Sequence, residues 1–227
     1  MGQIVDIILV PQGAEYRAVR RGLGATAIPI LPIPIGAVPL RQQIHRWQNA
    51  GQLLAGQRIL VMGLCGGLVP RRAIADVVLY RECIDRAEFR STFTCDAALT
   101  QQIQAKLAGH VTLVNALTSD RLVWSAHEKQ QLAQRYDAEV VDMEAVAAIA
   151  SLTTAGAVTA MLRVVSDDAQ HDLPDLTAAI GADGSLRAWP LALGMLKQPI
   201  AASRLIRGSL RSLKTLQAIA TRLGREP

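Results

Sequence analysis

Short apolar runs rich in β-branched residues alternate along the chain with stretches of helical character, and this alternation limits the fold more than any other feature. The apolar runs that we expect to be buried strands span residues 4–10, 58–64, 75–81, 110–118 and 158–165. Helices are expected at 15–21, 41–54, 97–108, 127–136 and 143–156, with shorter extended segments at 27–35 and 139–141. Strands that alternate with helices are typical of an α/β protein, so we expect one domain, residues 1–196, built on a largely parallel sheet.

Composition excludes several classes of protein. Half of the 227 residues are hydrophobic and only 19% are charged, which rules out a disordered chain. Aromatic residues make up 4%, so the chain lacks the faces on which bases stack, and we expect no nucleic-acid partner. Cys65, Cys83 and Cys95 form no CxxC pair, and the first residues lack the basic region of a signal peptide. These features predict a cytoplasmic protein with reduced thiols and no metal site.

Positive charge is concentrated in residues 197–227. The formal net charge is +5, but this region carries seven basic residues and one acidic residue, so the other 196 residues sum to −1. On a helical wheel, six of the basic residues fall within an arc of roughly 80°. They are Arg204, Arg207, Arg211, Lys214, Arg222 and Arg225. We therefore predict a basic amphipathic C-terminal helix, which either docks on the domain by its apolar side or makes peripheral contact with an anionic membrane.

Polar residues gather at the ends of three predicted strands. Residues 63–68 form the glycine-rich loop GLCGGL, Asp142 and Glu144 follow the extended segment 139–141, and Ser166 and Asp167 follow the strand 158–165. Ligands of open α/β sheets bind beyond the carboxyl ends of the strands. The candidate site is therefore expected at this edge of the sheet.

Each of these features has a chemical role and an ordinary structural one. Adjacent glycines allow a close backbone approach to a ligand, or simply a tight turn. The like charges of Asp167 and Asp168 are expected to raise at least one pKa, which suits a proton donor, whereas a helix cap would also explain one carboxylate. Glu144 is equally consistent with compensation of a helix dipole. No histidine partner is placed beside Cys65, so we expect no nucleophilic cysteine.

Three segments together resemble one enzyme family. In order and spacing, MGLCGGLVPRRAIADVV, VVDMEAVAAIA and LRVVSDDA resemble the glycine-rich, ribose and purine motifs of the nucleoside phosphorylase and nucleosidase superfamily. The segments TSDRLVWSAHEKQQLA and LPDLTAAIGADGSLR are similar to those of one branch, the hopanoid-associated phosphorylases, which release adenine from the lipid nucleoside adenosylhopane. The resemblance implies a single-domain, three-layer fold with a central mixed, largely parallel sheet.

The resemblance implies a role for each residue that matches a motif. Asp167 matches the acid that protonates or hydrogen-bonds purine N7 as the base leaves. Glu144 matches the carboxylate that holds the ribose 2′- and 3′-hydroxyls, and Met143 is expected to pack against the sugar. Ser166 and Arg163 are expected to support Asp167 from behind.

Four further matching residues are expected to surround the nucleoside. Gly66 and Gly67 match the nucleophile side of the ribose. Val123 falls where family members bind adenine through backbone atoms, and Leu122 falls where the nucleosidases often carry a stacking Phe. The resemblance thus predicts weaker stacking on the base here.

The nucleophile is left open by the resemblance. Hexameric phosphorylases carry an arginine two residues before the glycine loop, where this chain has Val61. Glu15 lies near the position of the carboxylate that activates water in nucleosidases, whereas Arg17 could instead reach phosphate. Hydrolysis and phosphorolysis are therefore both consistent with the sequence, with phosphate as a co-substrate in the second case and no other cofactor.

The chemistry of N-glycosidic cleavage fits these residues. Breaking the bond leaves positive charge on the ribose and negative charge on the base, which a carboxylate at the hydroxyls and an acid at N7 stabilise. We therefore predict an enzyme, a nucleoside phosphorylase or nucleosidase, that releases adenine from a lipid-linked adenosine. Methylthioadenosine or S-adenosylhomocysteine is the alternative substrate, and a catalytically silent nucleoside- or lipid-binding protein is the alternative of another class. The resemblance also implies a homo-oligomer, at least a dimer, and a membrane-bound helix would place it at the inner membrane surface.

Overall fold

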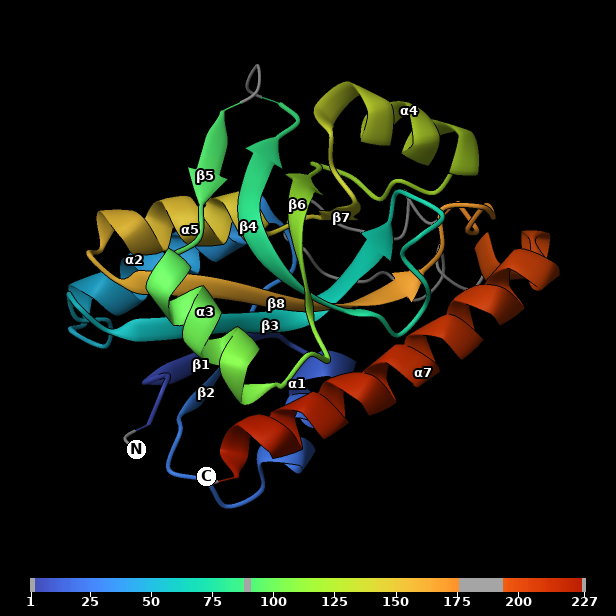
Figure 1. Ribbon diagram of the computed structural model, residues 1–227. Helices are drawn as coiled ribbons and strands as arrows, with labels where there is room; N and C mark the ends of the chain where they lie inside the picture. The colour runs from blue at the N-terminus through green and yellow to red at the C-terminus, as the bar shows by residue number, and fades with distance from the viewer. Residues whose placement is uncertain (1–2, 88–90, 176–193, 226–227) are drawn as a thin grey trace.

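The computed structural model describes residues 3–87, 91–175 and 194–225, so most of the segment LPDLTAAIGADGSLR lies outside the described residues (Figure 1). The strands are β1 (Ile7–Pro11), β2 (Ile30–Ile33), β3 (Arg58–Gly67), β4 (Val77–Asp85), β5 (Thr92–Thr94), β6 (Thr112–Thr118), β7 (Val140–Asp142) and β8 (Val158–Asp167). The helices are α1 (Ala14–Leu23), α2 (Ala37–Asn49), α3 (Ala97–Lys106), α4 (Ala126–Tyr136), α5 (Ala145–Thr154) and α7 (Pro199–Gly224).

All strands of the described chain belong to one mixed sheet. The strand order is β2-β1-β3-β7-β6-β4-β5, and β8 pairs with both β3 and β4. Five of the pairings are parallel, whereas β7 on β3, β5 on β4 and β8 on β4 are antiparallel. The prediction of a mixed, largely parallel sheet is therefore confirmed. The pairings also close β3, β8, β4, β6 and β7 into a ring, which the order of elements along the chain does not predict.

The sheet has an apolar core on each face, which confirms the predicted three layers. In β3, Ile59 and Val61 enter one core and Leu60 and Met62 enter the other, because alternate strand residues point to opposite faces. Helices α2 and α5 complete the first core, and α1, α3 and α7 complete the second. Figure 1 shows these two groups of helices on opposite sides of the sheet.

Several element boundaries differ by a few residues from the sequence prediction, and one helix start and one additional strand have local explanations. Helix α2 begins at Ala37 rather than at Arg41, because Pro39 lies in the first turn, where its missing N–H breaks no helical hydrogen bond. Strand β5 was not expected, because its three residues are too short a run to show alternation. It pairs with β4 at the edge of the sheet.

The long helix α7 packs along α1 and the end of β8. Ser212 Oγ donates a hydrogen bond of 2.6 Å to the carbonyl oxygen of Val165. At Gly208 a Cβ atom would lie 2.3 Å from the carbonyl oxygen of Ser166, so only glycine allows this approach. The helix therefore docks on the domain and supports the strand end that carries Asp167. Within the described ranges, no helix has the length and apolar character needed to span a bilayer.

Candidate active site

A pocket of about 260 Å³ lies where β1, β3, β7 and β8 end. This volume is near the lower end of the range usual for ligand pockets, roughly 300–1,000 Å³. Eight of the predicted site residues line it, and they come from α1, three strand ends and the segment before α4. They are Glu15, Gly66, Leu122, Val123, Met143, Glu144, Ser166 and Asp167. The fold thus brings together residues that are far apart in the sequence.

One end of the pocket holds three carboxylates around one arginine, and we call Glu15, Asp142, Glu144 and Arg163 the carboxylate cluster. Arg163 is fully buried on β8, with its guanidinium 3.2 Å from Asp142 Oδ2 and 3.9 Å from Glu144 Oε2. Glu15 belongs to the same cluster, because a Cβ atom added at Gly63 would meet both Arg163 and the Glu15 carboxylate. Three carboxylates and one guanidinium group leave an excess of negative charge at this end of the pocket.

Backbone N–H groups donate hydrogen bonds to all three of these carboxylates. The N–H of Leu64 donates to Glu15 Oε1 at 2.6 Å, and the N–H of Gly36 donates to Glu144 Oε1 at 3.1 Å. Asp142 accepts hydrogen bonds from the hydroxyl of Thr118 and the N–H of Ala145, at 3.0 and 3.2 Å. The acids are therefore held in place before any ligand binds.

Burial and mutual repulsion change the proton affinity of the cluster. Burial raises the pKa of Glu15 to about 7, against the opposing effects of Arg163 and the Leu64 N–H. Burial, assisted by Asp142, also raises the pKa of Glu144, although Arg163 opposes it. Burial alone would lower the pKa of Arg163, but its carboxylate neighbours, Asp142 foremost, raise it, so Arg163 stays charged. A carboxylate with a pKa near 7 can take up a proton at neutral pH, which suits a general base.

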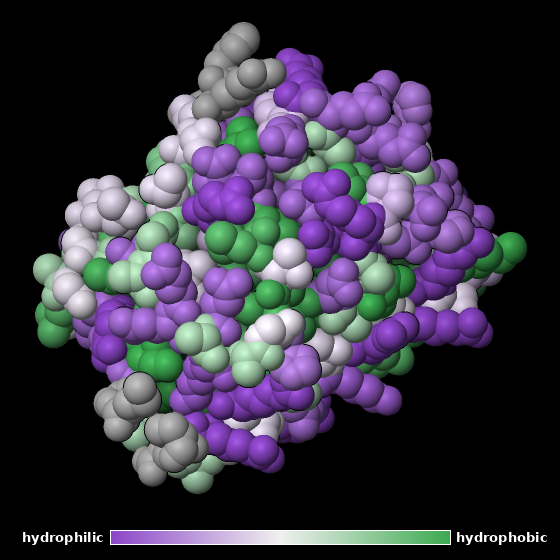
Figure 2. Space-filling view, viewed as in Figure 1, coloured by the Kyte–Doolittle hydropathy of each residue, from purple (hydrophilic) through white to green (hydrophobic). Residues whose placement is uncertain are grey.

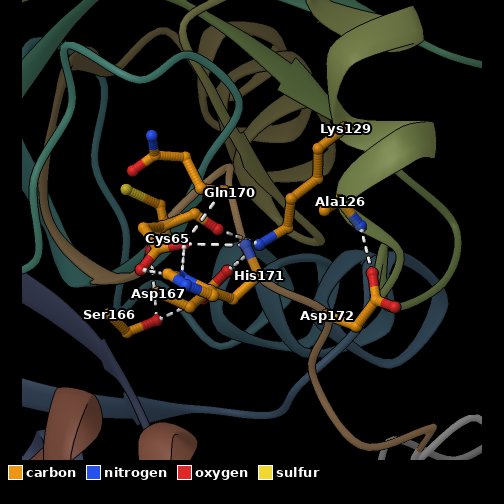
Figure 3. Close-up of polar contacts among 9 residues, drawn as sticks. Cys65, Ala126, Lys129, Ser166, Asp167, Gln170, His171 and Asp172 are labelled. Carbon is orange, nitrogen blue, oxygen red and sulfur yellow. Dashed lines mark hydrogen bonds and ion pairs between the residues drawn. The ribbon is translucent and has the colours of Figure 1, made fainter. Parts of the chain in front are cut away.

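The other end of the pocket is centred on Asp167. The hydroxyl oxygen of Ser166 lies 2.9 Å from Asp167 Oδ1 and 3.1 Å from the carbonyl oxygen of Cys65. Lys129, from α4, forms an ion pair with Asp167 Oδ2 and donates to the carbonyl oxygen of Asp168 at 2.7 Å (Figure 3). We call Lys129 and Asp167 the acid pair.

Asp168 does not share the environment of Asp167, because adjacent residues at a strand end point in different directions. Its Oδ1 accepts hydrogen bonds from the N–H groups of Gln170 and His171, at 2.9 and 3.0 Å. Burial would raise the pKa of Asp168, but these hydrogen bonds and the His171 ring lower it. The expectation that like charges raise one of the two pKa values therefore fails for Asp168, which stabilises a turn.

Three predicted residues lie elsewhere than expected. Arg163 was expected to support Asp167, but its ion pairs are with Asp142 and Glu144, because strand alternation points it toward the other end of the pocket. Arg17 is exposed on α1 and does not line the pocket. Gly67 lies just behind it, where an added Cβ would be 3.1 Å from the carbonyl oxygen of Asp167.

Leu122 and Val123 line the pocket beside Arg121. The guanidinium of Arg121 is paired with Glu128, at 2.6 Å, and Glu128 also binds Arg86 at 3.0 Å. One carboxylate is therefore shared by two guanidinium groups, so this group of three residues keeps a net positive charge at the pocket wall. Burial raises the pKa of the nearby Cys65 thiol, so this cysteine is protonated and does not act as a nucleophile.

Sequence reasoning missed Asp142 as a member of the carboxylate cluster and Lys129 as the partner of Asp167. Asp142 stands in the quoted segment VVDMEAVAAIA, next to Met143 and Glu144, so its position was a usable signal. Lys129 stands in the polar sequence HEKQQ, which is typical of the solvent-exposed face of a helix. Its complete burial could not be inferred without the position of β8.

Comparisons with known proteins agree with this architecture. A model of the phosphorylase superfamily matches residues 50–183, whereas no curated protein sequence matches the chain. The 5′-methylthioadenosine/S-adenosylhomocysteine nucleosidase of Helicobacter pylori superposes with a TM-score of 0.65 at 15% identity, over 94% of this chain and 96% of that one. Futalosine hydrolase of Helicobacter pylori gives 0.66 at 15% identity, over 95% and 97%. The 5′-methylthioadenosine nucleosidase of Arabidopsis thaliana gives 0.67 at 16% identity, over 96% and 93%, so all three share this fold.

Proposed function

The chain belongs to the phosphorylase superfamily, as an enzyme of the nucleoside phosphorylase or nucleosidase type, and from this premise we propose that it hydrolyses the N-glycosidic bond of an adenine nucleoside. The observation that carries the proposal is a pair of carboxylates in contrasting surroundings within one pocket, Glu15 and Asp167. Both line the same pocket, Glu15 against Gly63 and Asp167 against Gly66 of β3. An acid and a base at different positions of one pocket suit the two sides of one glycosidic bond.

The proposed reaction assigns one role to each end of the pocket. Asp167 delivers a proton to purine N7 while the C1′–N9 bond breaks and its electron pair moves onto the base. Glu144 binds the ribose hydroxyls and favours the positive charge that develops on the sugar. A water molecule bonds to C1′, and Glu15 accepts its proton. Met143, at the pocket wall, packs against the sugar.

Water is favoured over phosphate as the nucleophile by charge. The carboxylate cluster holds three acids and one arginine, an arrangement that repels a phosphate anion. Val61, where the resemblance would require an arginine, is completely buried in the apolar core, and Arg17 faces solvent. A base with a pKa of about 7 is useful for water and unnecessary for phosphate, which is already ionised.

The test is adenine release from adenosine, methylthioadenosine and a 5′-alkyl adenosine, each with and without phosphate. We expect equal release in both conditions, and release only with phosphate would overturn the choice of water. No release from any of the three would favour a nucleoside- or lipid-binding protein instead.

A lipid-linked adenosine is the proposed substrate, and soluble methylthioadenosine or S-adenosylhomocysteine is the second candidate. The first is supported by the resemblance to the hopanoid-associated branch and by the surface of α7. The second is supported by the shared fold with nucleosidases that carry these substrates in their names. A lower KM for the alkyl adenosine than for methylthioadenosine would support the lipid substrate, and the reverse would support the soluble one.

The outer surface of α7 supports contact with a membrane. The helix docks on the domain mostly through small residues such as Ala202 and Ser212, which leaves larger apolar residues outside. Ile200, Ile206 and Leu210 of α7 are 70%, 49% and 56% exposed, and Leu196, just before this helix, is 77% exposed; α7 also carries exposed basic residues. In Figure 2, hydrophilic side chains project along the lower right edge, where α7 runs in Figure 1, and a hydrophobic group stands at its far right end.

An anionic lipid surface fits this region better than a second copy of the chain. Because residues 197–227 carry +6, two copies facing each other through α7 would repel, whereas anionic lipid attracts them. Apolar side chains beside a basic stripe are typical of helices that lie in the membrane interface. We therefore propose residues 197–227 as a peripheral membrane-binding region, with the active homo-oligomer formed through other surfaces. Size measurement in solution tests the oligomer.

Charge reversal on α7 tests the membrane proposal without removing the helix that supports β8. The variant Arg207→Glu/Arg211→Glu is compared with Arg41→Glu/Arg46→Glu, an equal charge change at exposed sites of α2. Each basic residue near anionic lipid contributes about 1 kcal/mol, so we expect the α7 variant to bind phosphatidylserine vesicles at least tenfold more weakly. The α2 variant should bind like the wild type. Equal binding by all three proteins would refute membrane contact through α7.

A further inference from the structure

Lys129 is a completely buried cation, and the mechanism proposed above gives it no role. Its Nζ reaches Asp167 Oδ2 and the carbonyl oxygen of Asp168, and the residue does not line the pocket. Figure 3 shows the side chain extending from α4 toward the end of β8. Lys129 therefore approaches Asp167 from behind, on the side away from a bound nucleoside.

Stability alone is a poor explanation for such a pair. Burying two charges costs free energy of desolvation, and apolar residues of similar volume often stabilise a protein as well or better. The pair also involves a carboxylate that faces the pocket, where it occupies one oxygen of Asp167 while Ser166 occupies the other. Lys129 thus holds Oδ2, and the single hydroxyl proton of Ser166 is shared between Oδ1 and the carbonyl oxygen of Cys65, which limits rotation of the carboxylate.

The arrangement of protons has a consequence for the reaction. The ammonium of Lys129 lies against Asp167 Oδ2, on the side of the carboxylate away from the pocket. A purine leaving as an anion needs a proton at N7. The nearest acidic hydrogen behind Asp167 is on Lys129 Nζ.

We propose that Lys129 is a positioning residue that acts through Asp167 and supplies the proton for the departing base; this rests on the function proposed above. As the C1′–N9 bond breaks, N7 takes a proton from Asp167 Oδ2, and Oδ2 takes one from the ammonium of Lys129. The electron pair of the broken bond stays on the purine, which leaves neutral. Water supplies the new C1′–O bond and gives its proton to Glu15, and exchange with solvent restores Lys129 and Glu15 after product release.

Helix α4 is held where this role requires it. The carboxylate of Asp172 accepts a hydrogen bond of 2.7 Å from the N–H of Ala126, the first residue of α4. The N–H of Leu173 donates to the carbonyl oxygen of Trp124 at 2.9 Å. The segment after Asp167 and the start of α4 are therefore tied together, and this connection sets the position of Lys129 relative to Asp167.

The test compares Lys129→Met, Lys129→Arg, Asp167→Asn and the double variant Lys129→Met/Asp167→Asn by the kinetics of adenine release. We expect Lys129→Met to lower kcat about 100-fold with KM within about threefold, because a general acid contributes 10²–10⁴ in rate. Lys129→Arg keeps the charge but does not release a proton, so it should recover little of this loss, and full recovery would overturn the role as proton source. The double variant should be no slower than Asp167→Asn, because the two residues act as one unit.

Lys106→Met, at a half-buried lysine far from the pocket whose Nζ donates to the carbonyl oxygen of Arg225, is the control and should behave like the wild type. If Lys129→Met does not fold, Lys129→Gln, which keeps a donor and removes the charge, makes the same comparison. An active wild type with Lys129→Met near full kcat, or losses that multiply in the double variant, would overturn the inference and leave the proposed function intact. A wild type that releases no adenine would overturn both.

Discussion

Strand β8 contributes to both ends of the pocket, Arg163 to one and Asp167 to the other, but the two ends differ in their balance of charge. At one end, three carboxylates share Arg163; at the other, Asp167 has Lys129 to itself. Burial, with a smaller contribution from Glu144, raises the pKa of Glu15 to about 7 against the opposing effect of Arg163, whereas Asp167 has an ammonium group directly beside it. The difference teaches that burial and the nearest charged partner, more than the type of residue, decide which carboxylate accepts a proton and which delivers one.

The largest expected effect comes from removing the acid. Asp167→Asn cannot pass a proton to N7, so we expect adenine release to fall by about 10³, because general acids contribute 10²–10⁴. Asp168→Asn is the matched control, since Asp168 only stabilises a turn, and it should retain at least a third of the activity. Near wild-type turnover in Asp167→Asn, with an intact circular dichroism spectrum, would contradict the assignment.

Removing the base should have the next largest effect and should change the pH dependence. For wild type, kcat/KM should rise about tenfold per pH unit below pH 7 and level off above it, because Glu15 accepts a proton only when ionised. Glu15→Gln should lose about 10² in rate and also this rise with pH. A pH profile that is unchanged in the variant would show that another group is the base.

Two alanine substitutions in β3 should each introduce a steric clash at a different end of the pocket. At Gly63 the new Cβ would lie 2.1 Å from the Arg163 guanidinium, and at Gly66 it would lie 3.0 Å from Asp167 Oδ2. We expect Gly63→Ala to lower the free energy of unfolding by about 1–3 kcal/mol, because Arg163 has no room to move. Gly66→Ala should mainly lower kcat, by about tenfold. Thermal unfolding and steady-state kinetics of both variants check this. An equal loss of stability in the two variants would contradict the expected difference between the two ends of the pocket.

The smallest effect concerns stability and pH. Between pH 4.5 and 7 the folded state binds more protons at Glu15 than the unfolded state does, so this group lowers stability as the pH rises. Glu15→Gln should therefore be more stable than wild type above pH 7, by on the order of 1–3 kcal/mol, and the gain should vanish near pH 4.5. Urea unfolding at both pH values measures it. A gain of the same size at pH 4.5 would point to packing instead of ionisation.

Much of the fold could be predicted because it follows from local patterns. The apolar runs at 58–64 and 158–165 became β3 and β8, and the helix from Met143 became α5, since periodicity and glycine positions act over a few residues. The ring of strands could not be predicted, because β7 on β3 and β8 on β4 are pairings between distant segments.

The site shows the same limit. The strand ends that carry Glu144 and Asp167 could be found, since polar residues that close an apolar run are visible in the sequence. The partners of Arg163 and of Lys129 could not, because they depend on which face of a neighbouring strand each side chain meets. A lysine in a polar helical segment is usually exposed, and only the packing of α4 against the end of β8 buries this one.

Strand β8 lies between two strands that precede it by a long stretch of chain, pairing Leu60 with Ala160 and Leu79 with Leu162. During synthesis, β3 and β4 are therefore made long before β8, and the edges that β8 pairs with stay unpaired until it has been made. Contacts between such distant segments form slowly, and open strand edges recruit other chains. We expect refolding from denaturant to be slow and its yield to fall as protein concentration rises. Pairing of β8 with β3 and β4 should be the step after which the chain no longer aggregates.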